Sequence, residues 1–267
     1  MDCLSGVRGF LIDLDGVLYV GNKAIAGAPD AIRYIISHGY PFRCVSNTTR
    51  KSRQSIARHL SSLGFDIPED RIFTPPLAAI TYMKKTGKMT YFLLSTGDVD
   101  LDFAGIGAIV PGSRPDWVII GDAGERVTYD SMNTAFRYLM DGAELLALEN
   151  DRYWRAADGL SLSAGPFVRA LEFATGKTAT VMGKPSPDFF NLALQDMHML
   201  PEEVAMIGDD IDTDIGGAHH AGMKSVLVKT GKFRTESLLS AEIQPSCIID
   251  SFSGILDFIK NCGLTIR

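Results

Sequence analysis

The stretch Gly9-Phe10-Leu11-Ile12-Asp13-Leu14-Asp15-Gly16 (residues 9–16) decides the fold. Its apolar run, residues 9–12, stops abruptly at Asp13, which is typical of a buried parallel strand that runs into a loop. A second expected strand, residues 42–45, likewise ends at the polar Ser46. Strands that end in polar loops are typical of a parallel α/β sheet with its chemistry at the carboxyl ends of the strands. We therefore expect a doubly wound parallel-sheet core of the α/β class.

Segments with helical periodicity accompany these predicted strands. Pro29 can open a helix after the first strand, and late in the chain Ser186 can cap a helix that Pro187 opens. Strands are expected at residues 204–207 and 225–228, so the early pattern returns near the end of the chain.

A second series of strands and helices lies between the two blocks. Its expected strands are near residues 91–94, 117–120 and 145–148, and its expected helices are near 76–86, 131–141 and 166–175. The economical interpretation is one core, residues 1–74 and 181–267, with an α/β domain inserted at 75–180.

Composition narrows the function classes. The 267 residues are 46% hydrophobic, as in an ordinary globular protein. Their formal charge of −6 argues against a general nucleic-acid binder, because such a protein needs a basic surface. No apolar run approaches the roughly 20 residues of a membrane-spanning helix, and the chain starts without a basic region followed by an apolar stretch. We therefore expect no nucleic-acid or membrane partner and a cytoplasmic location.

The cysteines are too scattered for a zinc knuckle. A disulfide framework is also unusual in a chain of this length, so reduced, packed thiols are expected. The four residues are Cys3, Cys44, Cys247 and Cys262.

Carboxylates gather after the predicted core strands. Asp13 and Asp15 follow the first strand, and a late strand runs into Gly208-Asp209-Asp210-Ile211-Asp212-Thr213-Asp214. Converging carboxylates repel one another unless a cation balances them. Mg²⁺ binds a few carboxylate oxygens, keeps several waters and suits phosphate substrates, so it is the cofactor that we expect.

The order of these motifs resembles the haloacid dehalogenase-like phosphatase superfamily, which has a Rossmann-like core. Asp13-Leu14-Asp15-Gly16-Val17 is similar to its first motif, and Ser46, with Asn47 beside it, to its second. Lys184 in Gly183-Lys184-Pro185 is similar to the third motif, and residues 208–214 are similar to the acidic fourth.

The resemblance implies roles for four aspartates. Asp13 would be the nucleophile that forms an aspartyl-phosphate, and Asp15 the general acid and base. Mg²⁺ would bind the carboxylates of Asp13 and Asp209 and the main-chain carbonyl of Asp15. Asp214 would orient the waters bound to the metal without binding the metal itself. Dehalogenases of this superfamily lack the second acid, so Asp15 favours phosphoryl transfer.

The same resemblance implies a phosphate-binding set. Ser46 and the Asn47 amide would donate hydrogen bonds to phosphoryl oxygens, and Lys184 would neutralise charge on the phosphate and the nucleophile. The expected substrate is a small phosphorylated metabolite: a phosphomonoester, or a phosphoamidate or pyrophosphate.

The inserted segment resembles the larger α/β cap, called C2, of subfamily IIA, with its NagD-like and 4-nitrophenylphosphatase-like members. The resemblance is strongest to the subgroup of phospholysine phosphohistidine inorganic pyrophosphate phosphatase, whose vertebrate members carry serine at the position of Asp15. Residues 152–159 are the candidate substrate-facing loop, in which Arg152 and Arg155 could bind an acidic leaving group and Trp154 could stack on a flat one. A homodimer through the cap is also implied.

Two alternatives stay open at this point. A phosphomutase would use the same aspartyl-phosphate but return the phosphoryl group to a sugar, usually beneath a small helical cap. A non-enzymatic interaction module would keep the core with weak activity. Phosphate release from a substrate panel, with and without Mg²⁺, separates the three readings.

Overall fold

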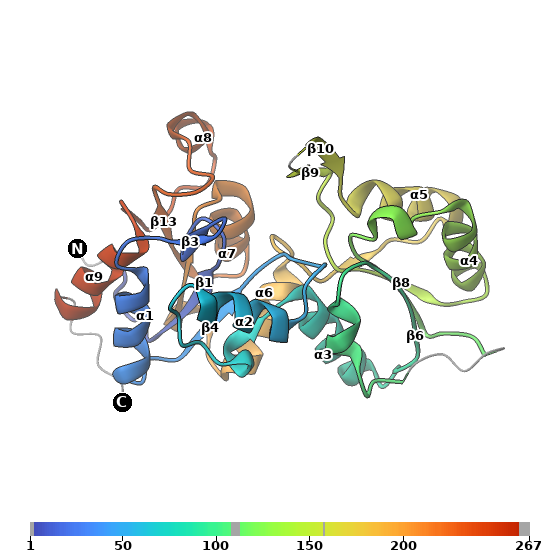
Figure 1. Ribbon diagram of the computed structural model, residues 1–267, viewed down its shortest axis with the longest axis horizontal. Helices are drawn as coiled ribbons and strands as arrows, with labels where there is room; N and C mark the ends of the chain where they lie inside the picture. Colours follow the sequence, from blue (N-terminus) through green and yellow to red (C-terminus); the bar gives the residue numbers. More distant parts are fainter. Residues whose placement is uncertain (1–2, 108–112, 157, 262–267) are drawn as a thin grey trace. The chain divides into compact units, whose positions relative to one another are not determined.

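The computed structural model describes residues 3–107, 113–156 and 158–261 (Figure 1). Contacts within the chain divide it into two compact units. The first unit comprises Met1–Ser46, Ile56–Phe73 and Lys184–Arg267, and the second comprises Asn47–Ser55 and Thr74–Gly183. Within the described ranges, no helix is both long enough and apolar enough to cross a membrane.

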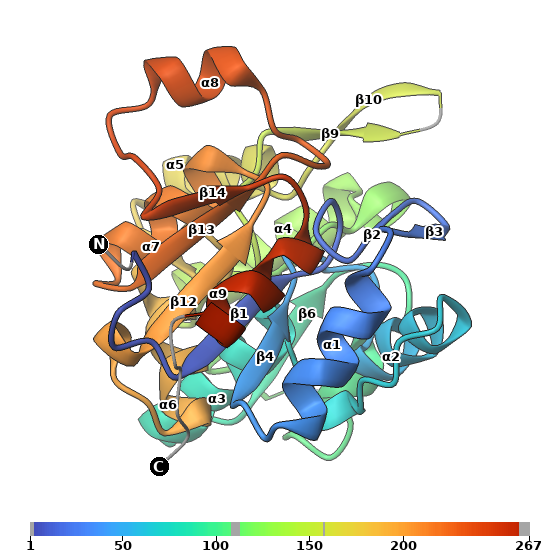
Figure 2. The same cartoon turned by 90° about the vertical axis from the view of Figure 1, so that its left-hand side faces the viewer.

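The first unit is built on a six-stranded sheet in the order β14-β13-β12-β1-β4-β5, and every strand pair is parallel (Figure 2). The strands are β1 (Gly9–Asp13), β4 (Phe42–Val45), β5 (Ile72–Phe73), β12 (Val204–Gly208), β13 (Lys224–Val228) and β14 (Cys247–Ile249). The four core strands expected from the sequence are β1, β4, β12 and β13. A parallel doubly wound sheet is therefore confirmed as the core fold.

Helices cover both faces of this sheet. They are α1 (Ala28–Ser37), α2 (Arg53–Ser62), α6 (Pro187–Met197), α7 (Gly217–His220) and α9 (Ile255–Asn261), although α2 begins in residues assigned to the second unit. The short helix α8 (Thr235–Ser240) of the same unit has no buried residue and projects from the sheet. Phe10 and Ile12 of β1 share one core with Ile32 and Ile35 of α1, and Figure 2 shows α1 and α9 on that side. Alternate strand residues face opposite sides, so both faces of β1 are buried.

One helix start differs from the expectation. Pro187 does open α6, but Ser186 makes no side-chain capping hydrogen bond. Its main-chain carbonyl instead accepts a hydrogen bond from the N–H of Phe189 at 3.1 Å. The backbone thus makes the first turn, and the predicted hydroxyl cap is wrong.

The second unit has its own four-stranded parallel sheet in the order β11-β8-β7-β6. Its strands are β6 (Tyr91–Leu94), β7 (Trp117–Ile120), β8 (Glu144–Ala147) and β11 (Thr180–Val181), and its helices are α3 (Pro75–Thr86), α4 (Tyr129–Met140) and α5 (Gly165–Thr175). The expected strands and helices of the insert are all present here.

Two antiparallel hairpins and several short helices complete the described chain. The hairpins are β2 (Tyr19–Val20) with β3 (Lys23–Ala24), and β9 (Tyr153–Ala156) with β10 (Gly159–Leu162). The short helices are η1 (Glu69–Arg71), η2 (Val99–Phe103), η3 (Gly124–Arg126), η4 (Pro201–Glu203), η5 (Ile211–Gly216) and η6 (Phe252–Gly254). The candidate loop at residues 152–159 is largely the β9–β10 hairpin, and Ala157 within it lies outside the described residues.

The cysteines correct the sequence-based expectation of reduced thiols. Cys3 and Cys247 form a disulfide across 244 residues of sequence, and Cys44 is a free, buried thiol. The spacing argument considered cysteines that are close in sequence, whereas folding brings the N-terminal segment to the edge strand β14. Cys262 lies outside the described residues.

Removing this disulfide should destabilise the protein, because the cross-link closes a loop of 244 residues in the unfolded chain. We expect Cys3→Ser to lower the free energy of unfolding by about 4 kcal/mol. Urea denaturation with and without reductant measures the effect, and the Cys3→Ser/Cys247→Ser variant is the control on which reductant should have no effect. Equal stability of the oxidised and reduced wild type would contradict this prediction.

Candidate active site

The register of the first sheet gathers the predicted residues of that unit at one edge. Asp13 is the last residue of β1 and pairs with Val45 of β4, so Ser46 follows at the same edge. On the other side of β1, Ile12 pairs with Ile207 of β12, and Asp209 comes directly after that strand. Parallel strands end together, which is why segments far apart in sequence meet here.

Lys184 lies at the centre of the site. Its Nζ donates to Asp13 Oδ1 at 2.5 Å and to Asp214 Oδ1 at 2.6 Å, and its side chain is only 4% exposed. Burial alone would lower the pKa of Lys184, but the charges of Asp13 and Asp214 raise it above its usual value. The ammonium therefore stays protonated and holds both carboxylates in place.

Three buried carboxylates converge around this lysine. Asp13, Asp209 and Asp214 each offer an oxygen, and the three oxygens lie within 4.8 Å of one another. Burial is the main cause that raises the pKa of Asp209 and of Asp214 to about 6, and it raises the pKa of Asp13 against the opposing effect of Lys184. One ammonium does not balance three carboxylates, so the cluster favours a further cation.

Asp15 differs from these three because its side chain is exposed. The loop around it is closed by the N–H of Gly16, which donates to the carbonyl of Tyr19 at 2.7 Å. Burial raises the pKa of the Tyr19 phenol, and the charges of Asp15 and Asp13 raise it further, so this ring stands near both acids. Tyr19 was not identified from the sequence.

In the acidic loop after β12, one carboxylate caps a short helix and two others belong to the buried cluster. Asp210 Oδ1 accepts hydrogen bonds from the N–H groups of Asp212 and Thr213 and so caps η5. The N–H of Asp210 donates to Asp214 Oδ2 at 3.2 Å, which fixes the second oxygen of that carboxylate. The side chain of Asp212 is exposed. Only Asp209 and Asp214 of this loop therefore join the cluster.

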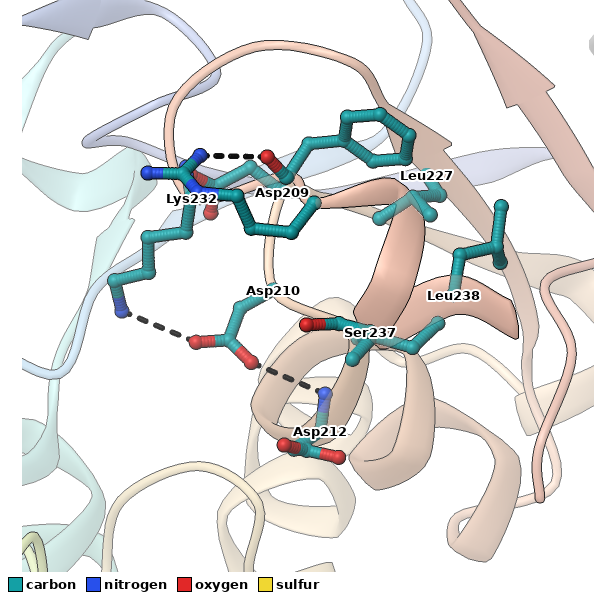
Figure 3. A pocket seen from close by; sticks show the side chains of 10 residues that line it. Asp209, Asp210, Asp212, Leu227, Lys232, Ser237 and Leu238 are labelled. Carbon is teal, nitrogen blue, oxygen red and sulfur yellow. Dashed lines mark hydrogen bonds and ion pairs between the residues drawn. The ribbon is translucent and has the colours of Figure 1, made fainter. Parts of the chain in front are cut away.

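The loop after β13 closes over Asp209, a contact that the sequence analysis missed. The N–H of Lys232 donates to Asp209 Oδ2 at 2.6 Å. The Nζ of Lys232 lies 3.2 Å from Asp210 Oδ2, as Figure 3 shows. Gly16 and Gly231 have positive φ angles, and a Cβ on either would fall about 2 Å from Asp209 Oδ2. Glycine at both positions lets two backbones approach the carboxylate. The sequence signal that could have indicated this contact is Gly231, which follows β13 at the same edge of the sheet as Asp13.

The remaining predicted residues lie in or beside the second unit. Ser46 and Asn47 are partly exposed at the end of β4, and Asn47 is the first residue that contacts assign to the second unit. Arg155 and Trp154 are in β9, where neighbouring side chains point to opposite faces of the hairpin. The two side chains therefore cannot bind one leaving group together from the same face.

Comparisons with known proteins agree with this geometry. Residues 10–107 match the family model "Haloacid dehalogenase-like hydrolase", and residues 181–255 match a model described as HAD-hydrolase-like. The chain is 42% identical over 254 residues to haloacid dehalogenase-like hydrolase domain-containing protein 2 of Bos taurus, covering 95% of this chain and 96% of that protein. It is 39% identical over 262 residues to the human phospholysine phosphohistidine inorganic pyrophosphate phosphatase, covering 96% and 95%.

A solved structure extends the likeness to the whole fold. The 4-nitrophenylphosphatase of Thermotoga maritima matches with a TM-score of 0.87 and 26% identity, covering 96% of this chain and 99% of that one. The resemblance drawn from the four motifs is confirmed by these matches.

Replacing the central lysine should expose the unbalanced charge. We expect Lys184→Met to lower the free energy of unfolding at pH 7.5 by about 3–5 kcal/mol, because it leaves buried carboxylates without their cation. The deficit should shrink at pH 5, because acids whose folded-state pKa is raised stabilise the fold as they protonate. Urea denaturation at both pH values measures this effect. A deficit that is equal at pH 5 and pH 7.5 would argue against carboxylate repulsion as its cause.

Proposed function

The chain belongs to the haloacid dehalogenase-like hydrolase family, and we propose that it is a Mg²⁺-dependent phosphatase of small phosphorylated metabolites that acts through an aspartyl-phosphate. One observation carries the proposal: a buried strand-end carboxylate, Asp13, is held by the Lys184 ammonium beside two further acids. An isolated buried carboxylate would be protonated and a poor nucleophile, whereas the lysine favours its charged form.

The donor set fits Mg²⁺. Asp13 and Asp209 would bind the ion through carboxylate oxygens, and Asp15 through its main-chain carbonyl. Asp214 already accepts hydrogen bonds on both oxygens, from Lys184 and from the N–H of Asp210, so its place is to support the site rather than to bind directly. When bound, the ion would neutralise charge on the transferring phosphoryl group.

The residues of the chain then divide the chemistry. Asp13 attacks phosphorus in line: its carboxylate oxygen forms a bond to phosphorus as the bond to the leaving oxygen breaks. Asp15 protonates that leaving oxygen, and in the second step it takes a proton from the water that hydrolyses the aspartyl-phosphate. The exposure of Asp15 suits a group that must reach both the leaving group and water.

Phosphate binding is assigned to residues at the neighbouring strand end. Ser46 and the Asn47 amide donate to phosphoryl oxygens, and Lys184 offsets the charge that gathers on the phosphate and on Asp13. These donors recognise the phosphoryl group alone and leave the rest of the substrate unspecified.

Specificity is assigned to the second unit acting as a cap. A separately folded insert that closes over a phosphoryl site excludes water and selects the leaving group. The name of the human relative specifies phospholysine, phosphohistidine and inorganic pyrophosphate, so phosphoamidates and pyrophosphate belong beside phosphomonoesters in the substrate panel. We also propose that a homodimer forms through this cap.

Two aspartate variants test the covalent step. We expect Asp13→Asn to lower hydrolysis of 4-nitrophenyl phosphate roughly 10⁴-fold or more while the protein stays folded. Asp15→Asn should lose roughly 10²–10⁴-fold and accumulate phosphorylated protein, because 4-nitrophenolate leaves without much acid assistance whereas hydrolysis still needs a base. Phosphate release and intact-protein mass spectrometry measure the two effects. Near-normal turnover by Asp13→Asn would rule out the nucleophile, and phosphoryl transfer to a sugar in place of release would indicate a mutase.

Metal binding can be measured without turnover. We expect calorimetric titration to detect Mg²⁺ binding to the wild type and at least tenfold weaker binding to Asp209→Asn, because a ligand carboxylate is lost. Asp212→Asn is the matched control, since Asp212 lies in the same loop with an exposed side chain outside the cluster. Equal loss in both variants would mean that the loop attracts Mg²⁺ only through its overall charge.

A further inference from the structure

The segment that follows the predicted phosphate-binding serine is fixed firmly within the second unit. Thr49 is buried, and its Oγ1 accepts a hydrogen bond from the N–H of Asp122 at 2.9 Å. Ser52 is also buried, and its N–H and hydroxyl donate to the carboxylate of Asp98 at 2.9 and 3.0 Å. The backbone of residues 47–55 is therefore held on both sides of Arg50 and Lys51, the two residues between these anchors.

Arg50 presents a guanidinium with unused hydrogen-bonding capacity. Its carbonyl accepts from the N–H of Asp98 at 3.2 Å, while its side chain is 44% exposed. The guanidinium lies 5.3 Å from the centre of the Trp154 ring, and its Nη1 lies 3.6 Å from Asp122 Oδ2. Among the residues that the structure describes, none accepts a hydrogen bond from this guanidinium, although it carries five N–H donors.

The hairpin that carries Trp154 is anchored at its base. Glu149 is buried and accepts hydrogen bonds from the hydroxyl of Ser163 and from the N–H groups of Ala164 and Asp151, at 2.5 to 2.7 Å. These contacts clamp both ends of the segment that contains β9 and β10. Figure 1 shows the hairpin projecting from the sheet of its own unit. These hydrogen bonds therefore hold the base of the hairpin that carries Trp154.

The register of the hairpin separates Trp154 from Arg155. Trp154 pairs with Ser161 and Arg155 with Leu160, so the two side chains point to opposite faces of the ribbon. Arg50 contacts the Trp154 face. Arg50 thus lies on the aromatic face, whereas the sequence-based candidate Arg155 lies on the other face.

We infer that Arg50 is a specificity-determining residue: its guanidinium, backed by Trp154, binds an anionic oxygen group on the leaving part of the substrate. The inference rests on the proposed phosphatase function. Three peptide units separate Arg50 from Asn47, so their Cα atoms are at most about 11 Å apart, close enough for one substrate to reach both residues. A planar guanidinium stacked on an aromatic ring keeps its edge donors available for a carboxylate or phosphate. Asp122 orients the group without accepting a hydrogen bond.

Three substrates separate leaving-group charge from phosphoryl transfer. Phenyl phosphate has a neutral leaving part, 4-carboxyphenyl phosphate adds a carboxylate to it, and inorganic pyrophosphate has a second phosphate. We expect Arg50→Met to lower kcat/KM for the two anionic substrates roughly tenfold or more beyond its effect on phenyl phosphate, mainly through KM. Loss confined to one anion also supports the inference and identifies the group as a carboxylate or a second phosphate.

Further variants separate the role of Arg50 from a general loss of charge or structure. Arg50→Lys keeps the charge without the planar fork and should recover only part of the discrimination. Trp154→Ala should show a smaller selective loss than Arg50→Met. Arg169→Met is the matched control, because Arg169 is an exposed arginine on α5 of the same unit, paired with Glu172, and it should leave all three rates unchanged.

Two results would overturn the inference. One is an equal loss on all three substrates in Arg50→Met, with an unchanged melting temperature. The other is selective loss in Arg155→Met but not in Arg50→Met. If the wild type hydrolyses phenyl phosphate, either result contradicts only the role of Arg50. If the wild type hydrolyses none of the three substrates with Mg²⁺ present, the proposed function itself is contradicted and the inference falls with it.

Discussion

A single buried ammonium is the interaction on which the candidate active site depends. Lys184 donates to Asp13 and to Asp214, which come from the first strand and from the loop after β12. Removing three carboxylates from water is costly, and the cost is tolerable only where each oxygen has a partner. The lysine supplies one positive charge, the main-chain amides of Asp210 and Lys232 supply further donors, and the remaining imbalance suits a divalent cation.

The sheet explains why these groups meet, and the loops explain how they are oriented. The parallel register sets Asp13 beside the end of β4 and near the end of β12, so the backbone itself brings the groups of these three strand ends together. Close approach then sets the orientation of Asp209, because Gly16 and Gly231 leave no room for side chains around its carboxylate. The chemistry thus depends on backbone geometry as much as on the acids themselves.

The residues proposed for phosphate recognition and for leaving-group recognition lie on one short segment of the chain. Residues 47–55 begin one residue after Ser46, yet their hydrogen bonds go to Asp98 and Asp122 of the inserted segment. A specificity residue in this segment stays close to the proposed phosphoryl-binding amide of Asn47 through the chain itself. Arg50 is close to Asn47 in the sequence, whereas a residue on the β9–β10 hairpin is distant in the sequence and can approach Asn47 only through tertiary contacts.

The sequence by itself determined four strands of the first sheet, three strands of the second and the main catalytic candidates, because each is a local pattern: an apolar run that stops at an acid, or a motif at a strand end. Asp13, Lys184, Asp209 and Asp214 could be found in this way. Local patterns could not show that Asp210 caps η5, that Cys3 meets Cys247, or that Arg50 rather than Arg155 lies against Trp154. Only the tertiary structure decided these points, since each depends on which face a side chain takes and which distant backbone approaches it.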